Sequence, residues 1–280
     1  KLHTVSIDKT RKLIKKGTKN LKLPGKVRLA IDFTNKRYYG DKNHPEVMGS
    51  KGGKYVRKYI QVSTVTPALF LNAISVNQLT NDKESLFIEL LDTFYEQYKK
   101  TKIELLLLDR EFFTKKVTKL LVENRIPFIM PAKKDRKIKK LVEAYGKGEI
   151  DSKIKYPFGD TTINLLFLKV DDDILVYATN TRKDVITVHR DYKKRWQIET
   201  NFREQNNFTF RTCSTDFNIR YLAFVLAGLL FNSWQLTRNL LPYKLESYLF
   251  KHYLLDEILG LWQSIARKEV VKSIDYFLVA

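Results

Sequence analysis

The feature that most restricts the fold is a nearly continuous apolar run at residues 103–108, which ends in Asp109. Such a run is typical of a strand that is buried on both faces of a sheet. Residues 82–99 and 112–124 around it have helical periodicity, and residues 127–130 form a second short apolar run. Strands that alternate with helices predict an α/β fold. Ligands of such sheets sit beyond the carboxyl ends of the strands, where Asp109 falls.

A second carboxylate lies near the end of an earlier strand. Residues 27–34 predict a strand that contains Asp32, and residues 55–65 and 68–76 predict an antiparallel pair that turns at Thr66-Pro67. Burying an aspartate inside an apolar strand is unfavourable unless it has a partner, a metal or solvent. Residues 35–54 between the first two strands are polar and glycine-rich, which predicts a mobile functional loop.

Residues 191–206 contain no glycine or proline and predict one helix. Positions three or four apart share a helical face, and here that face carries Tyr192, Arg195, Glu199, Phe202 and Asn206. An amphipathic helix would place aliphatic side chains on such a face. The simpler interpretation is a surface helix in which Arg195 and Glu199 form an ordinary i,i+4 ion pair.

Residues 131–183 interrupt the alternation of strands and helices. A basic cluster opens this region and leads into a short helix that ends near Gly146; the cluster contains Lys133, Lys134, Arg136 and Lys137. Residues 161–170 and 174–179 predict two strands around three consecutive aspartates. These aspartates suggest either a metal site or, far better supported between two apolar runs, a hairpin turn. We interpret the region as a mostly β insertion that presents basic residues.

Two apolar helices are predicted near the end of the chain, at residues 219–241 with Trp234 and at residues 245–267 with Trp262. Both are expected to pack on the sheet. The longest apolar run, residues 221–231, is too short to cross a bilayer and indicates a buried helix, so no membrane partner is expected.

The charge of the chain bears on its partners. Lys and Arg number 51 against 31 Asp and Glu, a net charge of +20, and a polyanion such as nucleic acid is the first candidate partner. Part of this excess can also be a solvated basic surface. The N-terminal basic run contains an expected helix at residues 8–16 and is either a solvated arm or a DNA-backbone contact. The single Cys213 cannot form an internal disulfide, which fits a reduced cytoplasmic setting.

These patterns together resemble one known family. The meander, the later strand with Asp109 and the late helix with Glu199 resemble the ribonuclease H fold. The motifs Ile-Asp32-Phe-Thr, Leu-Leu-Asp109-Arg-Glu-Phe-Phe and Tyr192-x2-Arg195-x3-Glu199 resemble the DDE transposases of bacterial and archaeal insertion sequences. In the most similar group a β insertion precedes the final glutamate, and the signature ends in a lysine. That lysine position is Asn206 here, which brings no charge.

The resemblance implies a ribonuclease H-like α/β fold, a mixed sheet flanked by helices, with the insertion before the last catalytic helix. Its expected parts are a basic segment (1–26), a core in two pieces (27–131 and 184–241), the insertion (132–183) and a C-terminal helical segment (242–280).

It also implies that Asp32, Asp109 and Glu199 bind two Mg²⁺ ions, with Mn²⁺ as a substitute, and act as the catalytic residues. Three carboxylates suit a hard ion that prefers oxygen ligands, and two ions can assist an in-line displacement at phosphorus. The expected partner is double-stranded DNA, both transposon ends and target, bound by a nucleoid-associated homodimer. Tyr192, Arg195 and Asn206 are expected to contact DNA near the site, and Lys133, Lys134, Arg136 and Lys137 its backbone.

Three other interpretations remain open from the sequence. The chain can be an inactive DNA-binding remnant or regulator, a possibility that Asn206 keeps alive. It can be a basic α/β protein without a nuclease site, in which the three carboxylates would lie far apart. A ribonuclease of the same fold is the third.

Overall fold

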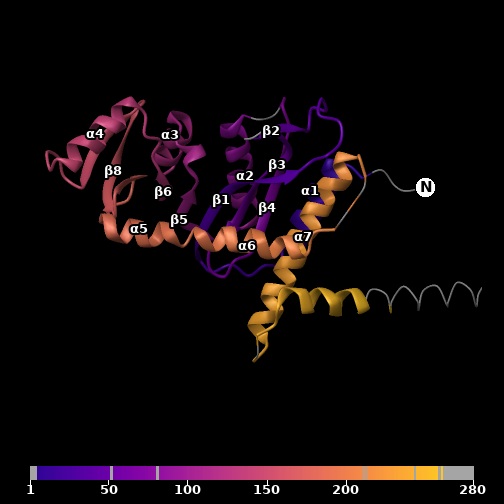
Figure 1. Cartoon of the computed structure of the whole chain (residues 1–280). Helices are drawn as coiled ribbons and strands as arrows, with labels where there is room; N and C mark the ends of the chain where they lie inside the picture. Colours follow the sequence, from indigo (N-terminus) through magenta and orange to yellow (C-terminus); the bar gives the residue numbers. More distant parts are fainter. Residues whose placement is uncertain are drawn as a thin grey trace, which may run out of the picture.

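The protein is built on one mixed sheet whose strands follow the order β2-β3-β1-β5-β6-β9-β8-β7, with β4 also paired to β3 (Figure 1). The computed structural model describes residues 5–50, 53–79, 82–210, 212, 214–242, 244–257 and 260. Within these residues the strands are β1 (Lys26–Arg37), β2 (Met48–Ser50), β3 (Lys54–Thr64), β4 (Phe70–Val76), β5 (Lys102–Leu108), β6 (Phe128–Pro131), β7 (Lys153–Phe158), β8 (Thr161–Val170) and β9 (Asp173–Thr179). The helices are α1 (Ile7–Thr18), α2 (Lys83–Gln97), α3 (Lys115–Glu123), α4 (Arg136–Gly146), α5 (Val185–Lys193), α6 (Trp196–Asn207) and α7 (Phe217–Leu240), and a 3-10 turn, η1, spans Arg110–Phe112.

The first part of the sheet confirms the predicted fold class. Strand β1 pairs with β3 antiparallel and with β5 parallel, and β4 and β6 extend the sheet on either side. Strand order β4-β3-β1-β5-β6 with helices on both faces is ribonuclease H-like. The predicted loop after β1 is shorter than expected, because β1 continues to Arg37 and β2 pairs with the start of β3.

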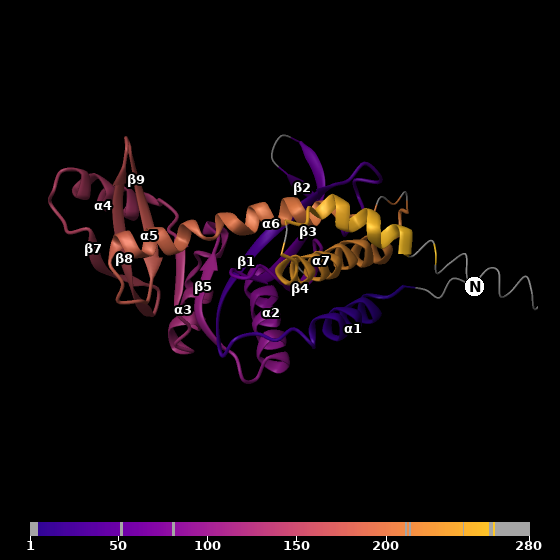
Figure 2. The ribbon, with the colours of Figure 1, turned by 90° about the horizontal axis from the view of Figure 1, so that it is seen from below.

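The alternation of side chains along the strands sends two sets of residues to opposite faces of the sheet. Leu29 and Ile31 of β1 pack with α2, α3 and the insertion in the largest core cluster. Ala30 of the same strand packs with Val188 of α5 and Phe202 of α6. Helices α5 and α6 run in line across this second face, and α7 and α1 cover its β3–β4 side (Figure 2). Asp32 therefore points toward α6.

The insertion continues the central sheet. Strand β9 pairs antiparallel with β6, with Ile129 opposite Thr179, and β8 and β7 follow outward. The three aspartates form the predicted hairpin turn, where Asp171 has a φ of +51° and Val170 pairs with Asp173. The sequence prediction missed β7, because Pro157 interrupts it; a proline is tolerated there since β7 is an edge strand.

Helix α7 confirms the first predicted C-terminal helix, and its Tyr221, Phe224 and Val225 are buried against β3 and β4. Its length and composition alone would allow a membrane span, but half of its most apolar window is buried inside the protein. The next helix, described at residues 247–257, does not pack on the sheet as expected. Its Phe250 contacts the Phe208 ring at the end of α6, since α6 and α7 already cover that face. Trp262 and Cys213 lie outside the described residues.

Candidate active site

Strands β1 and β5 bring two aspartates side by side. In the parallel register Ile31 is the partner of Leu108, and both side chains are fully buried in the core. Asp32 follows Ile31 on β1, and Asp109 follows Leu108 with extended backbone just after β5, so both carboxylates emerge on the opposite face, toward α6. Asp109 begins the 3-10 turn that follows β5, and its side chain makes no capping hydrogen bond there.

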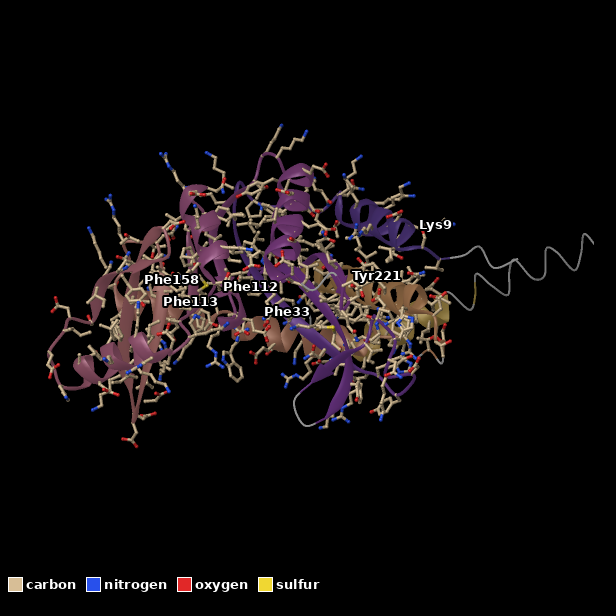
Figure 3. The ribbon with its side chains drawn as sticks, turned by 90° about the horizontal axis from the view of Figure 1, so that it is seen from above. Lys9, Phe33, Phe112, Phe113, Phe158 and Tyr221 are labelled. Atoms are coloured by element: carbon tan, nitrogen blue, oxygen red, sulfur yellow. The ribbon has the colours of Figure 1, made fainter. Side chains whose placement is uncertain are left out.

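An aromatic pair on the other face holds these strand ends in place. The rings of Phe33, which follows Asp32, and Phe112, in the turn after Asp109, are stacked with centroids 5.1 Å apart. The neighbouring Phe113 stacks at 4.3 Å on Phe158 of β7 (Figure 3). This row of four rings, Phe33–Phe112 and Phe113–Phe158, ties the turn that carries Asp109 to both the core and the insertion.

Arg195 joins the third carboxylate to the first. Its Nη1 donates to Asp32 Oδ2 at 2.7 Å and its Nη2 donates to Glu199 Oε1 at 3.0 Å. The Arg195 and Asp32 side chains are 11% and 13% exposed, whereas that of Glu199 is 44% exposed. The guanidinium thus lies between two of the candidate carboxylates, and its Nε has no hydrogen-bond partner among the residues that the structure describes.

The three carboxylates are close enough to act on one another. The pKa of Asp32 is raised to about 6, chiefly by burial and in part by the charges of Asp109 and Glu199, while Arg195 and the backbone N–H of Phe33 lower it. The sequence alternative without a nuclease site expected these groups to lie far apart, and the structure does not place them so.

The structure corrects the predicted single helix at residues 191–206. Helix α5 ends at Lys193 and α6 begins at Trp196, and the backbone N–H groups of Lys194 and Arg195 donate to Asp191 and Tyr192 three residues back. Both sides of this tight turn are anchored. Asp191 is buried and accepts from Arg28 and Lys183, while Arg195 is bound to Asp32.

Tyr192 packs beneath the turn. Its hydroxyl donates to Leu108 O at 3.4 Å, its ring lies 5.3 Å from that of Tyr177, and Arg195 lies over it at 5.5 Å. Burial raises the pKa of Tyr192 above its ordinary value, so the hydroxyl stays protonated. Tyr192 is thus held by packing contacts, and its expected contact with DNA stays a prediction.

Part of the predicted basic cluster opens onto this region. A cavity of about 580 Å³ is lined by Tyr192, Arg110, Lys133 and Lys134, among others. Lys134 also pairs with Asp173 at 2.8 Å. Arg136 and Lys137 begin α4, are exposed and do not line the cavity.

Asn206 lies two turns beyond Glu199 on α6 and is exposed. Its Oδ1 accepts a hydrogen bond from the ammonium of Lys36 on β1. The ammonium of Lys36 therefore lies beside position 206, where the transposase signature has a lysine. The sequence analysis missed Lys36, although the period of a strand places it on the same face as Asp32.

The donor set suits a hard divalent ion, because all three candidate ligands are carboxylates. Among the described residues, however, no group of three or more His, Cys, Asp or Glu is arranged to hold one. The guanidinium of Arg195 lies between Asp32 and Glu199 and binds both. Asp32, Asp109 and Glu199 offer the oxygen ligands that such an ion prefers, and an ion between Asp32 and Glu199 would have to displace Arg195.

Comparison with known proteins agrees with the fold. Residues 23–232, which include Asp32, Asp109 and Glu199, match the transposase DDE domain. This span is most of the chain, and the protein belongs to the DDE transposase family. A search of curated protein sequences finds no significant match.

Among solved structures the chain is similar to a piggyBac transposase, determined by cryo-EM as a synaptic complex with hairpin DNA, with a TM-score of 0.61. The sequences are 11% identical, and the alignment covers 85% of this chain and 53% of that one. The chain spans about half the length of that relative, and the likeness shows a shared fold.

Proposed function

We propose that the protein is an active DDE transposase that cleaves phosphodiester bonds at transposon ends and joins the freed ends to target DNA. The observation that carries this proposal is the convergence of Asp32, Asp109 and Glu199 on one face of the sheet, bridged by Arg195. Members of the family generally use divalent metal ions, and Mg²⁺ is the ion we propose, with Mn²⁺ as a substitute. Asp32, Asp109 and Glu199 would hold two such ions, which would help to activate water and to neutralise charge at the phosphate.

The chemistry is a hydrolysis followed by a transfer. A water oxygen attacks phosphorus, the bond to the 3′ oxygen breaks, and the water proton passes to solvent. The resulting 3′-hydroxyl then attacks a phosphodiester of the target strand and displaces its 3′ oxygen. Each step exchanges one P–O bond for another.

Arg195 is placed to serve two roles in this reaction. In the structure it forms ion pairs with Asp32 and Glu199 and offsets part of their charge. Once released from them, its planar guanidinium can bind two oxygens of a phosphate near the scissile bond. Tyr192 holds Arg195 from below with its ring and is a positioning residue.

Basic residues around the cavity would bind the phosphates of the DNA backbone. Lys133 and Lys134 lie at its wall, and Arg136 and Lys137 continue the basic surface along α4. We propose double-stranded DNA as the ligand and a homodimer on paired ends as the assembly. The structural neighbour was determined in complex with hairpin DNA, which supports DNA as the ligand.

The second candidate is an inactive DNA-binding remnant. Asn206 favours it, since this position brings no charge of its own. Lys36 beside Asn206 weakens that argument, because it supplies a cation from another strand.

The deciding experiment measures nicking of labelled duplexes taken from the DNA that flanks the coding sequence, with Mg²⁺ or Mn²⁺. The wild type should nick, and Asp109→Asn and Glu199→Gln should each abolish nicking while DNA binding is retained. Asp160→Asn, at an exposed carboxylate in the β7–β8 turn, is the matched control and should nick like the wild type. Binding without nicking by the wild type would support the inactive remnant, and nicking by both variants would show that other carboxylates act.

A further inference from the structure

A second cavity, of about 370 Å³, lies farther along the face that carries Asp32. Four of its lining residues are cations: Lys36, Arg37, Arg57 and Arg220. None of the described residues that line it is a carboxylate. We name this site the cationic pocket.

The strand register relates the cationic pocket to the carboxylates. Asp32, Thr34 and Lys36 alternate onto one face of β1, and Lys36 pairs directly with Arg57 on β3. Four residues of strand separate Asp32 from Lys36, a distance of about 13 Å. The same face thus changes from acidic to basic over the length of a few nucleotides.

Arg57 is the most buried cation of the pocket, with its side chain 3% exposed. Its Nη atoms donate to Phe217 O at 3.1 Å, Ser75 Oγ at 2.9 Å and Glu46 Oε2 at 3.4 Å, while its Nε has no partner. Buried polar groups in folded proteins nearly always have a partner, and among the described residues this Nε has none.

The other three cations are free of acidic partners within the described chain. Lys36 donates to the neutral amide of Asn206, and burial lowers its pKa. Arg220 donates through Nε to Ser214 O at 2.7 Å and lies over the Tyr38 ring. No ion pair joins Lys36, Arg37 or Arg220 to a described carboxylate. Their charges are available to an anion.

Two exposed rings complete the site. Tyr39 and Phe210 line the same cavity and are 85% and 42% exposed. Exposed aromatic rings beside cations are the features by which proteins bind single-stranded nucleic acid, since bases stack on rings and phosphates meet cations. A free phosphate would need only the cations.

We propose that the cationic pocket binds an unpaired nucleotide of the DNA strand whose cleaved bond lies at Asp32. The two phosphates that flank this nucleotide meet the four cations of the pocket, Arg37 and Arg220 included, and the base stacks on Tyr39 or Phe210. This assignment rests on the proposed function for the identity of the strand. The pocket would hold the separated strand next to the reacting phosphate.

The test measures binding of a labelled oligothymidylate of about 12 nucleotides, in EDTA so that cleavage plays no part. Arg37→Gln/Arg220→Gln should weaken binding about tenfold and reduce the slope of log K against log salt by about 1.4. Tyr39→Ala should weaken it further without changing that slope. The control Lys99→Gln/Lys100→Gln removes the same charge at the opposite end of β5 and should bind like the wild type.

Three outcomes would overturn the proposal: equal binding by pocket and control variants, an equal loss of fully paired duplex, or full competition by inorganic phosphate alone. Melting temperatures of all variants exclude misfolding as the cause, and Arg37 and Tyr39 are exposed, so their replacement spares the core. The outcome is independent of nicking. A protein that never nicks can still lose oligonucleotide binding here, which would retain the pocket and reject the transposase reaction.

Discussion

The guanidinium of Arg195 lies between Asp32 and Glu199, where we propose that a metal ion binds in the active protein. One arginine carries a single charge against three carboxylates, so the neutralisation is incomplete. Asp32 shows this imbalance, since burial and the two neighbouring carboxylates keep its pKa raised at about 6 despite Arg195. The candidate site is therefore a point of stored electrostatic strain in the metal-free protein.

Replacing Asp32 with Asn should stabilise the metal-free protein. The pKa of Asp32 is about 6 in the folded protein and 3.8 ordinarily, so the folded state binds more protons than the unfolded state between these pH values. The free energy of unfolding of the protein therefore falls as pH rises through this window. The gain from Asp32→Asn should approach about 3 kcal/mol near neutral pH and vanish below the window. Urea unfolding in EDTA, at neutral pH and at a pH below the window, measures this gain in the free energy of unfolding. A gain that is the same at both would contradict the prediction, and Asp160→Asn is the exposed control.

At the scale of single residues, the candidate carboxylates could be predicted from the sequence, whereas the contacts of several cations could not. Asp32, Asp109 and Glu199 could be selected because strand ends and helical spacing are local patterns. The contact of Lys36 with Asn206 joins residues 170 positions apart, so only the folded chain shows it. The same holds for Arg57 and Arg220, whose shared cavity depends on how α7 packs on β3.

The turn between β5 and α3 is an element fixed from both sides. Phe112 stacks on Phe33 of β1, and Phe113 stacks on Phe158 of β7. Because Asp109 begins this turn, its position depends on rings that belong to the core and to the insertion. The two aromatic pairs thus position a candidate catalytic carboxylate without contacting it.

Phe112→Ala should lower the free energy of unfolding by about 3–5 kcal/mol, because this ring is fully buried and leaves a cavity. Phe158→Ala removes a half-buried ring and should cost less. Denaturant unfolding compares the two variants. At temperatures where both are folded, nicking should fall more than duplex binding in each, since Asp109 is displaced while the basic surface remains. A parallel loss of nicking and binding would show that the rings only stabilise the fold.

Elements with a clear period were predicted, and those set by tertiary contacts were not. The meander, α2, β5 and the β8–β9 hairpin follow from local patterns. The break between α5 and α6 does not, because no glycine or proline marks it; buried ion pairs at Asp191 and Arg195 place it there. Strand β7 was hidden by Pro157, which its edge position allows.

Across the whole molecule, the insertion brings basic residues near the candidate site, since Lys133 and Lys134 line a cavity that Tyr192 also lines. Replacing Lys133, Lys134, Arg136 and Lys137 with Gln should weaken duplex binding and reduce the salt slope by about 0.9 for each phosphate contact that is lost. Lys134 already pairs with Asp173 and should contribute least. Titrations at several salt concentrations measure the slope.

The matched control for this set carries the same charge change at the amino ends of β1 and β5: Lys26, Lys99, Lys100 and Lys102, each to Gln. All four are exposed and lie at the opposite end of these strands from Asp32 and Asp109. An equal effect of the two sets on the slope would show that binding follows net charge and not this surface.

The pairing of β9 with β6 has a consequence for any shortened form of the chain. Without the insertion, β6 would become an edge strand with a row of unpaired backbone groups beside fully buried residues such as Ile129. Such an apolar edge is a template for pairing with a second chain. Excising residues 132–183 would therefore yield an aggregating protein, and the insertion protects the solubility of the core as well as carrying its basic surface.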